Sequence, residues 1–190
     1  HGALASLITK YNQLPLMHQE VWVYTKLVHR AHMVGAHQNG PSAQNECQIC
    51  GVVDTHEHAF LHCPMAASVW SELISWTEEA WTAEKLPIPR PNVALCLLAT
   101  HRGKVLTPTP RWWQLLQRIS MRWIWVSHAQ RLYGDDMQHD NPTSLTSHIQ
   151  SQFIDRLFWE WARTLNKRQR HAVSNMSPQE KFTDRWGAVV

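Results

Sequence analysis

Residues 46–64 read ECQICGVVDTHEHAFLHCP, and this stretch holds three of the four cysteines of the chain. Two residues separate the first two cysteines, seven more precede a histidine, and four more precede the third cysteine. A Cys-x-x-Cys turn brings two thiolates within reach of one ion, and the glycine that follows it lets the backbone fold back. The spacing predicts a small zinc knuckle with these ligands: Cys47, Cys50, His58 and Cys63.

The predicted ligand set leaves no open position on the metal. Three thiolates and one imidazole complete the tetrahedral coordination that zinc prefers, so we expect a structural Zn²⁺ ion. His56 competes with His58 as the fourth ligand, because an extended loop would let it reach the ion. His62 adjoins Cys63, and adjacent side chains rarely point at one centre. The alternative to a metal site is three reduced cysteines without a ligand. Cys96 stands apart and is expected to be an inert buried thiol.

Apolar residues outside the knuckle recur with helical spacing. Intervals of three and four residues predict helices over 16–33, from Pro64 to about residue 80, over 111–133 and from about residue 145 to 171. A further short helix is expected after Ser177. The last long helix is expected to bury one stripe: Ile149, Phe153, Leu157, Trp161 and Leu165. The predicted fold class is mainly α, a helical domain with a small Cys-Cys-His-Cys zinc knuckle near the N-terminal third.

A proline-rich segment divides the chain into two parts. Pro87, Pro89 and Pro91 predict a stiff, extended connector. We expect residues 1–86 to contain the N-terminal helices and the zinc knuckle (46–64), and residues 92–190 to form a helical basic region. Because 190 residues is the length of about one domain, we expect the two parts to pack together.

Charge is distributed unevenly between the two parts. Residues 1–100 carry five Lys/Arg and eight Asp/Glu, whereas residues 101–190 carry thirteen and seven. A basic half is typical of a surface that binds nucleic acid, although a solvated helical face explains the same excess from charge alone. The candidate phosphate-binding residues are Arg111, Arg118, Arg122, Arg163, Lys167, Arg168 and Arg170.

The cysteine segment resembles the zinc-binding region at the C-terminal end of non-LTR retrotransposon reverse transcriptases. The matching positions are Cys47, Cys50, Gly51, Asp54-Thr55, Glu57-His58, Phe60-Leu61, Cys63-Pro64 and Val69-Trp70. Members often have glutamate where this chain has Asp54. Leu27-Val28-His29-Arg30 is similar to a basic element that precedes the cysteines in the family, and Ile124-Trp125 to a later Ile-Trp pair. The strong match covers roughly residues 20–75. The resemblance implies descent from a mobile element and a role beside nucleic acid.

A polymerase-like motif is present but lacks its context. Tyr133-Gly134-Asp135-Asp136 spells the metal-binding turn of many polymerases, which requires a hairpin between apolar strands and a third acid to hold two Mg²⁺ ions. The residues before it here have a helical pattern, so we expect a helix end at Gly134. The acids Asp135, Asp136, Asp140, Asp155 and Glu160 form no acid-x-Lys strand pair of a nuclease either. We therefore expect no enzymatic activity.

Two functions follow as hypotheses. The first is a non-enzymatic, zinc-knuckle domain of retrotransposon origin that binds RNA or DNA with low sequence specificity. The second is a domesticated protein–protein interaction module, for example an effector that binds a host protein, because eleven tryptophans are more than one core needs. No apolar run of bilayer length and no leader segment is visible, so we expect an intracellular protein, nuclear or cytoplasmic, without a membrane partner. Because the chain starts with His1, we expect it to be a fragment or a processed product.

Overall fold

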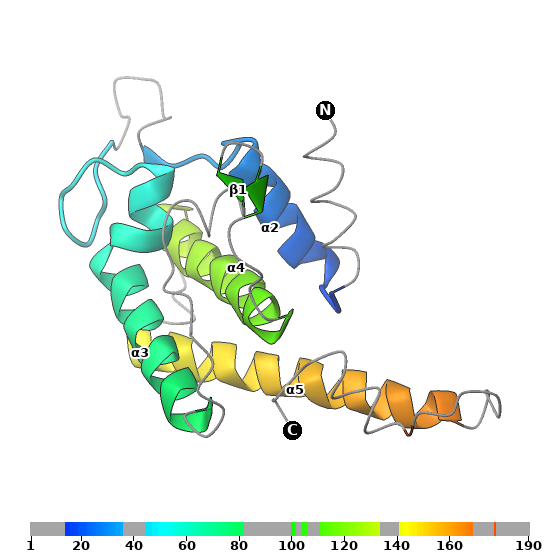
Figure 1. Ribbon diagram of the computed structural model, residues 1–190. Helices are drawn as coiled ribbons and strands as arrows, with labels where there is room; N and C mark the ends of the chain where they lie inside the picture. The colour runs from blue at the N-terminus through cyan, green and yellow to red at the C-terminus, as the bar shows by residue number, and fades with distance from the viewer. Residues whose placement is uncertain are drawn as a thin grey trace.

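The computed structural model describes residues 14–35, 45–81, 100–101, 104–105, 111–133, 141–168 and 177. The helices are α2 (His18–Val28), the short π-helix η2 (His58–His62), α3 (Pro64–Trp81), α4 (Arg111–Tyr133) and α5 (Pro142–Arg168) (Figure 1). Strands β1 (Thr100–His101) and β2 (Lys104–Val105) form a small antiparallel pair, in which Thr100 is paired with Val105. The predicted mainly helical class is confirmed.

Helix α4 is the centre of the fold. It packs against α2, α5 and η2, and Figure 1 shows it enclosed between α2 and the α3–α5 pair. Its buried residues include a stripe with helical spacing: Trp112, Leu115, Leu116 and Ile119. Because neighbours surround it, α4 also buries polar side chains that a helix on the surface would expose, such as Gln117 and Arg118.

Helices α3 and α5 pack against each other on the other side of α4. Proline at position 64 is well suited to the first turn of α3, since its missing N–H would have no partner there. The Trp76 ring meets the Phe153 ring edge-on at 6.0 Å, which joins the two helices.

The stripe predicted along α5 is buried only in its first half. Ile149 and Phe153 are buried and Leu157 is partly buried, but Trp161 is exposed. The prediction for Trp161 is therefore wrong, because the second half of α5 extends past α3 and α4 (Figure 1). The side chain of Leu165 lies outside the described residues.

Helix α2 is shorter than predicted and ends well before Gly35. Its last turn closes with two backbone bonds, from Ala31 N–H to the Lys26 carbonyl at 2.7 Å and from Arg30 N–H to the Leu27 carbonyl at 3.0 Å. Arg30 has a φ of 50°, so this is a Schellman-type end in which an arginine occupies the left-handed position usually given to glycine. The apolar periodicity continues to residue 33, whereas the helical backbone ends at Val28.

Aromatic rings fill the space between α2, η2 and α4. The His32 ring lies 4.1 Å from the Trp125 ring, which stacks on Phe60 with centroids 5.8 Å apart. His32 Nε2 donates a hydrogen bond of 2.8 Å to the Val23 carbonyl, and Trp70 Nε1 donates one of 2.9 Å to the Phe60 carbonyl. The polar edges of these rings are thus used to join elements within the core.

Several expectations fall on residues that the structure does not describe. They concern the proline connector, Cys96, the acidic segment after Tyr133, and the short helix after Ser177. The division of the chain into 1–86 and 92–190 stays a prediction. Within the described parts, none of the helices combines the length and the apolar character needed to cross a bilayer.

We predict that protonation of His32 destabilises the fold in mild acid. Burial lowers its pKa to about 4, despite the opposing hydrogen bond to Val23. The unfolded chain therefore takes up a proton, near pH 6.5, that the folded state excludes, so the stabilisation is complete above pH 6.5 and is lost as the pH falls toward 4. Urea unfolding should show a loss of about 2 kcal/mol at pH 5.

The control for this prediction is His32→Gln, which keeps an N–H donor for Val23 but does not titrate. Its free energy of unfolding should fall less between neutral pH and pH 5 than that of the wild type. The same pH dependence in both proteins would show that His32 is not responsible.

Candidate metal centre

The first two cysteines lie on a tight knuckle. Gly51 N–H donates to the Cys47 carbonyl and Cys47 N–H donates to the Val52 carbonyl, both at 2.8 Å. Gly51 has a φ of +70°, and an added Cβ would meet no atom within 4 Å. Glycine is therefore favoured here by its backbone conformation rather than by lack of space, which confirms the role expected of it.

The second pair of candidate ligands is positioned by η2. His58 is its first residue and Cys63 follows its last, and Cys63 N–H donates to the His58 carbonyl at 2.7 Å. In an α-helix, residues five apart point about 140° away from each other, because each residue turns the chain by about 100°. The wider π-turn brings the two side chains to the same side, and such turns are frequent at functional sites.

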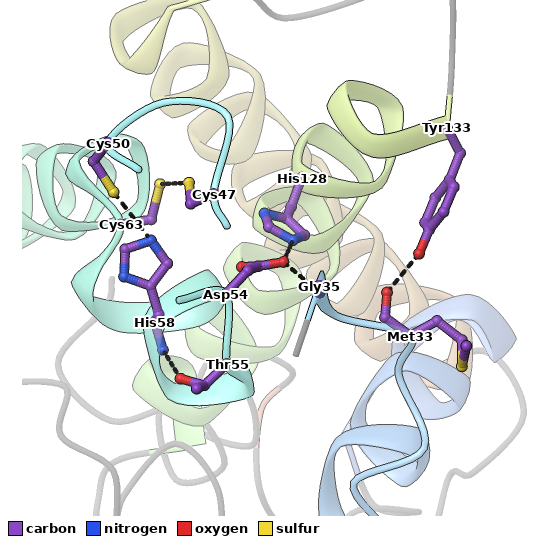
Figure 2. A network of polar contacts seen from close by, with 10 residues as sticks. All are labelled: Met33, Gly35, Cys47, Cys50, Asp54, Thr55, His58, Cys63, His128 and Tyr133. Carbon is purple, nitrogen blue, oxygen red and sulfur yellow. Dashed lines mark hydrogen bonds and ion pairs between the residues drawn. The ribbon is translucent and has the colours of Figure 1, made fainter. Parts of the chain in front are cut away.

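Three of the four predicted ligands, Cys47, His58 and Cys63, form one group, and the fourth, Cys50, approaches it beside His58 (Figure 2). Cys47 Sγ lies 3.8 Å from Cys63 Sγ, and Cys50 Sγ lies 3.3 Å from His58 Nε2. The ligand atoms of Cys47, His58 and Cys63 all lie within 4.8 Å of one another. With Zn–S bonds of about 2.3 Å and Zn–N bonds of about 2.0–2.1 Å, a tetrahedral site places sulfurs about 3.8 Å apart and sulfur about 3.5 Å from nitrogen. The group could therefore hold a metal ion.

The structure places the two competing histidines elsewhere. His62 is exposed and pairs with Glu57 at 3.1 Å. His56 is buried, with its ring 6.3 Å from that of His32. His58, in contrast, has its Nε2 atom 3.3 Å from Cys50 Sγ.

Burial controls the protonation of the ligands. It raises the pKa of the Cys63 thiol to about 11, and the neighbouring Cys47 adds to the shift. Burial also lowers the pKa of His58, so its ring is neutral and able to bind a metal near neutral pH. Metal binding replaces thiol protons and stabilises the thiolates, which overcomes the cost of buried charge. The Arg131 side chain, whose charge interacts favourably with Cys63 and Cys47, reduces that cost further.

Asp54 anchors the knuckle to the rest of the protein. It is fully buried, and its Oδ2 accepts hydrogen bonds from Gly35 N–H at 2.8 Å and from His128 Nε2 at 3.0 Å (Figure 2). Burial, the largest single effect, raises the pKa of Asp54, but the two hydrogen bonds together with the charges of His128 and His58 outweigh it, so the pKa is lowered. One carboxylate thus joins the knuckle, the segment after α2, and α4.

Sequence reasoning missed Asp54, His128 and Arg131 as parts of this site. Asp54 belongs to the cysteine motif, but nothing in the sequence pattern indicates that its carboxylate bonds to His128, 74 residues further along the chain. The helical stripe of α4 was visible, but which polar residues of α4 face the knuckle depends on how the helices pack.

The predicted phosphate-binding arginines of α4 are placed differently from expectation. Arg118 is 2% exposed, and its guanidinium lies 3.3 Å from the centre of the Tyr24 ring. Such a buried side chain offers no surface to a phosphate, so the expectation for Arg118 is corrected. Arg122 lies 3.8 Å from the Glu20 carboxylate and is mostly buried. Both residues hold α2 against α4, because α4 is central and this line of arginines faces a neighbour rather than solvent.

The other predicted cations are less buried or lie outside the described residues. Arg111 is half-buried at the start of α4. Arg163 is exposed and pairs with Glu160 at 2.9 Å. Lys167 and Arg168 lie in the last turn of α5, where side chains are not described, and Arg170 follows outside the described residues.

We predict that Asp54→Ala destabilises the protein by about 2–4 kcal/mol, because it leaves the buried His128 ring and the Gly35 N–H without their acceptor. Urea unfolding of the metal-loaded protein measures the effect. Asp155→Ala, which removes an exposed carboxylate on α5, should change stability by less than about 0.5 kcal/mol. Equal effects of the two substitutions would contradict the anchoring role of Asp54.

Comparison of the chain with protein-family models, with curated proteins and with solved structures finds no match. The interpretation of the site therefore rests on its geometry and on the cysteine motif.

Proposed function

We propose that the chain binds one Zn²⁺ ion through Cys47, Cys50, His58 and Cys63, and that the ion is structural. The observation that carries this proposal is the spacing of sulfur and nitrogen atoms, which suits a tetrahedral site. The donor set supports zinc, since thiolates with one imidazole form a common structural zinc site. Four protein ligands leave no position for water or substrate, so the metal has no catalytic role in this proposal.

We further propose that this zinc-stabilised domain is non-enzymatic and binds RNA or DNA with low sequence specificity. The resemblance of residues 20–75 to the zinc-binding region of non-LTR reverse transcriptases supports this function. Charge supports it too, because residues 101–190 carry thirteen Lys/Arg against seven Asp/Glu. The cations that would contact phosphate are Arg111, Arg163, Lys167, Arg168 and Arg170. Contacts to phosphate position a protein on nucleic acid and carry no sequence information, which accounts for low specificity.

A protein partner is the second candidate function. It is favoured by the outer half of α5, where Ile154, Phe158 and Trp161 follow one another at helical spacing and are all exposed. The Phe158 and Trp161 rings lie 6.0 Å apart. Exposed aromatic residues of this kind are typical of interface hot spots.

The metal content of the purified protein tests the proposed zinc site. The purified protein should contain one zinc ion per chain by native mass spectrometry, and a strong chelator should lower its thermal midpoint. Structural zinc contributes apparent binding free energies of about 10–16 kcal/mol, so its loss should abolish much of the fold. Cys63→Ser should lose the ion.

Cys96→Ser is the matched control, and its zinc content should equal that of the wild type. A protein that carries no metal after purification under reducing conditions, or that joins two of the four ligands in a disulfide, would contradict the proposal.

Removal of the cations at and just after the end of α5 tests the proposed binding of nucleic acid. Replacing Arg163, Lys167, Arg168 and Arg170 together by alanine should weaken binding to oligonucleotides by a similar factor for every sequence. Each lost phosphate contact should also lower the slope of log K against log salt by about 0.7–0.9. Fluorescence anisotropy over a range of salt concentrations measures both quantities.

Lys85→Ala with Arg90→Ala, in the acidic half of the chain, is the control and should have a smaller effect. Because Glu160 is buried and loses its partner Arg163, circular dichroism and zinc content must match between variants. A wild-type protein that binds no oligonucleotide at low salt, yet binds one defined protein through α5, would favour the second candidate.

A further inference from the structure

A groove of about 460 Å³ lies between α2 and α4. Its volume falls within the range of about 300–1,000 Å³ that is typical of ligand sites. Trp22 of α2 and Tyr133 of α4 line it, and they remain 45% and 58% exposed. Figure 1 shows the two helices side by side. The groove thus presents one exposed aromatic ring from each of its walls.

The groove also contains polar groups. Gln19, Arg122 and Gln130 line it together with Trp125. The Oε1 atom of Gln130 is buried and accepts no hydrogen bond from any residue that the structure describes. This oxygen is enclosed by protein atoms, so an occupant of the groove does not reach it. The polar character of the groove comes from the rest of these side chains.

The charge of the walls favours an anionic partner. Helix α2 has Glu20 as its one acidic residue, and this carboxylate is buried between Arg122 and Arg156. Helix α4 has no acidic residue. The Lys26 ammonium lies 3.9 Å from the centre of the Trp22 ring. A cation therefore lies over one face of the most accessible aromatic ring of α2, and no exposed carboxylate of either wall opposes it.

We propose that this groove binds a base of single-stranded nucleic acid, stacked on Trp22, with the adjoining phosphate beside Lys26. Aromatic platforms that alternate with cations are the usual means of binding single strands without sequence preference. This inference rests on the proposed nucleic-acid function and adds to it a defined site, separate from the end of α5.

The test compares two single-stranded DNA probes of about 12 nucleotides, oligo(dT) and an abasic strand with the same phosphates, on the zinc-loaded full chain. The wild type should bind oligo(dT) about fivefold to a hundredfold more tightly than the abasic strand, because base–aromatic stacking contributes that much per base. Trp22→Ala should remove this preference without changing binding to the abasic strand. Trp22→Phe, which keeps a ring, should restore part of it.

Trp159→Ala is the matched control, since Trp159 is exposed on α5 and does not line the groove. It should leave the preference for oligo(dT) intact. Equal binding of both probes by the wild type would overturn the groove proposal and leave the proposed function standing, whereas no binding of either probe would overturn both. An equal loss in Trp22→Ala and Trp159→Ala, or retention of the preference in Trp22→Ala, would also overturn the groove site.

Discussion

The carboxylate of Asp54 is the interaction on which the arrangement of the knuckle depends. Hydrophobic burial holds only the second half of the knuckle, because Phe60 and Leu61 are in the core whereas Val52 and Val53 are exposed. A fully buried charge is tolerated when it is hydrogen-bonded, and here Gly35 and His128, from two separate segments, both donate to its Oδ2 atom. These hydrogen bonds join residues that are close in space but distant in sequence. They therefore determine where the candidate metal site lies relative to α2 and α4.

Metal binding and this anchor would act on the same short segment from opposite sides. Cysteine and histidine side chains converge on one face of it, and Asp54 points to α4 on the other (Figure 2). Burial holds the Cys63 thiol in its protonated form, with a pKa of about 11, so this ligand is uncharged in the absence of a metal. In the proposed zinc-bound form, three thiolates against one Zn²⁺ ion leave a net negative charge, and Arg131 is placed to balance it.

Periodicity and motif spacing predicted the helical class, the start of α3, the extent of α4 and the convergence of Cys47, His58 and Cys63. Each of these depends on residues near one another in the chain, where local backbone preferences decide. The burial of Arg118 and the exposure of Trp161 depend instead on which helices are neighbours, and an amphipathic pattern has no information about that. The sequence does not predict the end of α2 for another reason. Arg30, two residues after its last residue, adopts the left-handed conformation, and an arginine in that conformation has no sequence signal.

The contacts that correct the assignment of the α4 arginines also build the walls of the groove. Arg118 lies over Tyr24, Arg122 approaches Glu20, and Tyr133 donates to the Met33 carbonyl at 2.8 Å. The first two join α2 to α4, and the third joins the segment after α2 to the end of α4. Trp22 remains exposed beside this seam. Arg118 and Arg122, which the charge pattern assigned to nucleic acid, would thus serve it indirectly, by holding together the walls of the site where a base is proposed to stack.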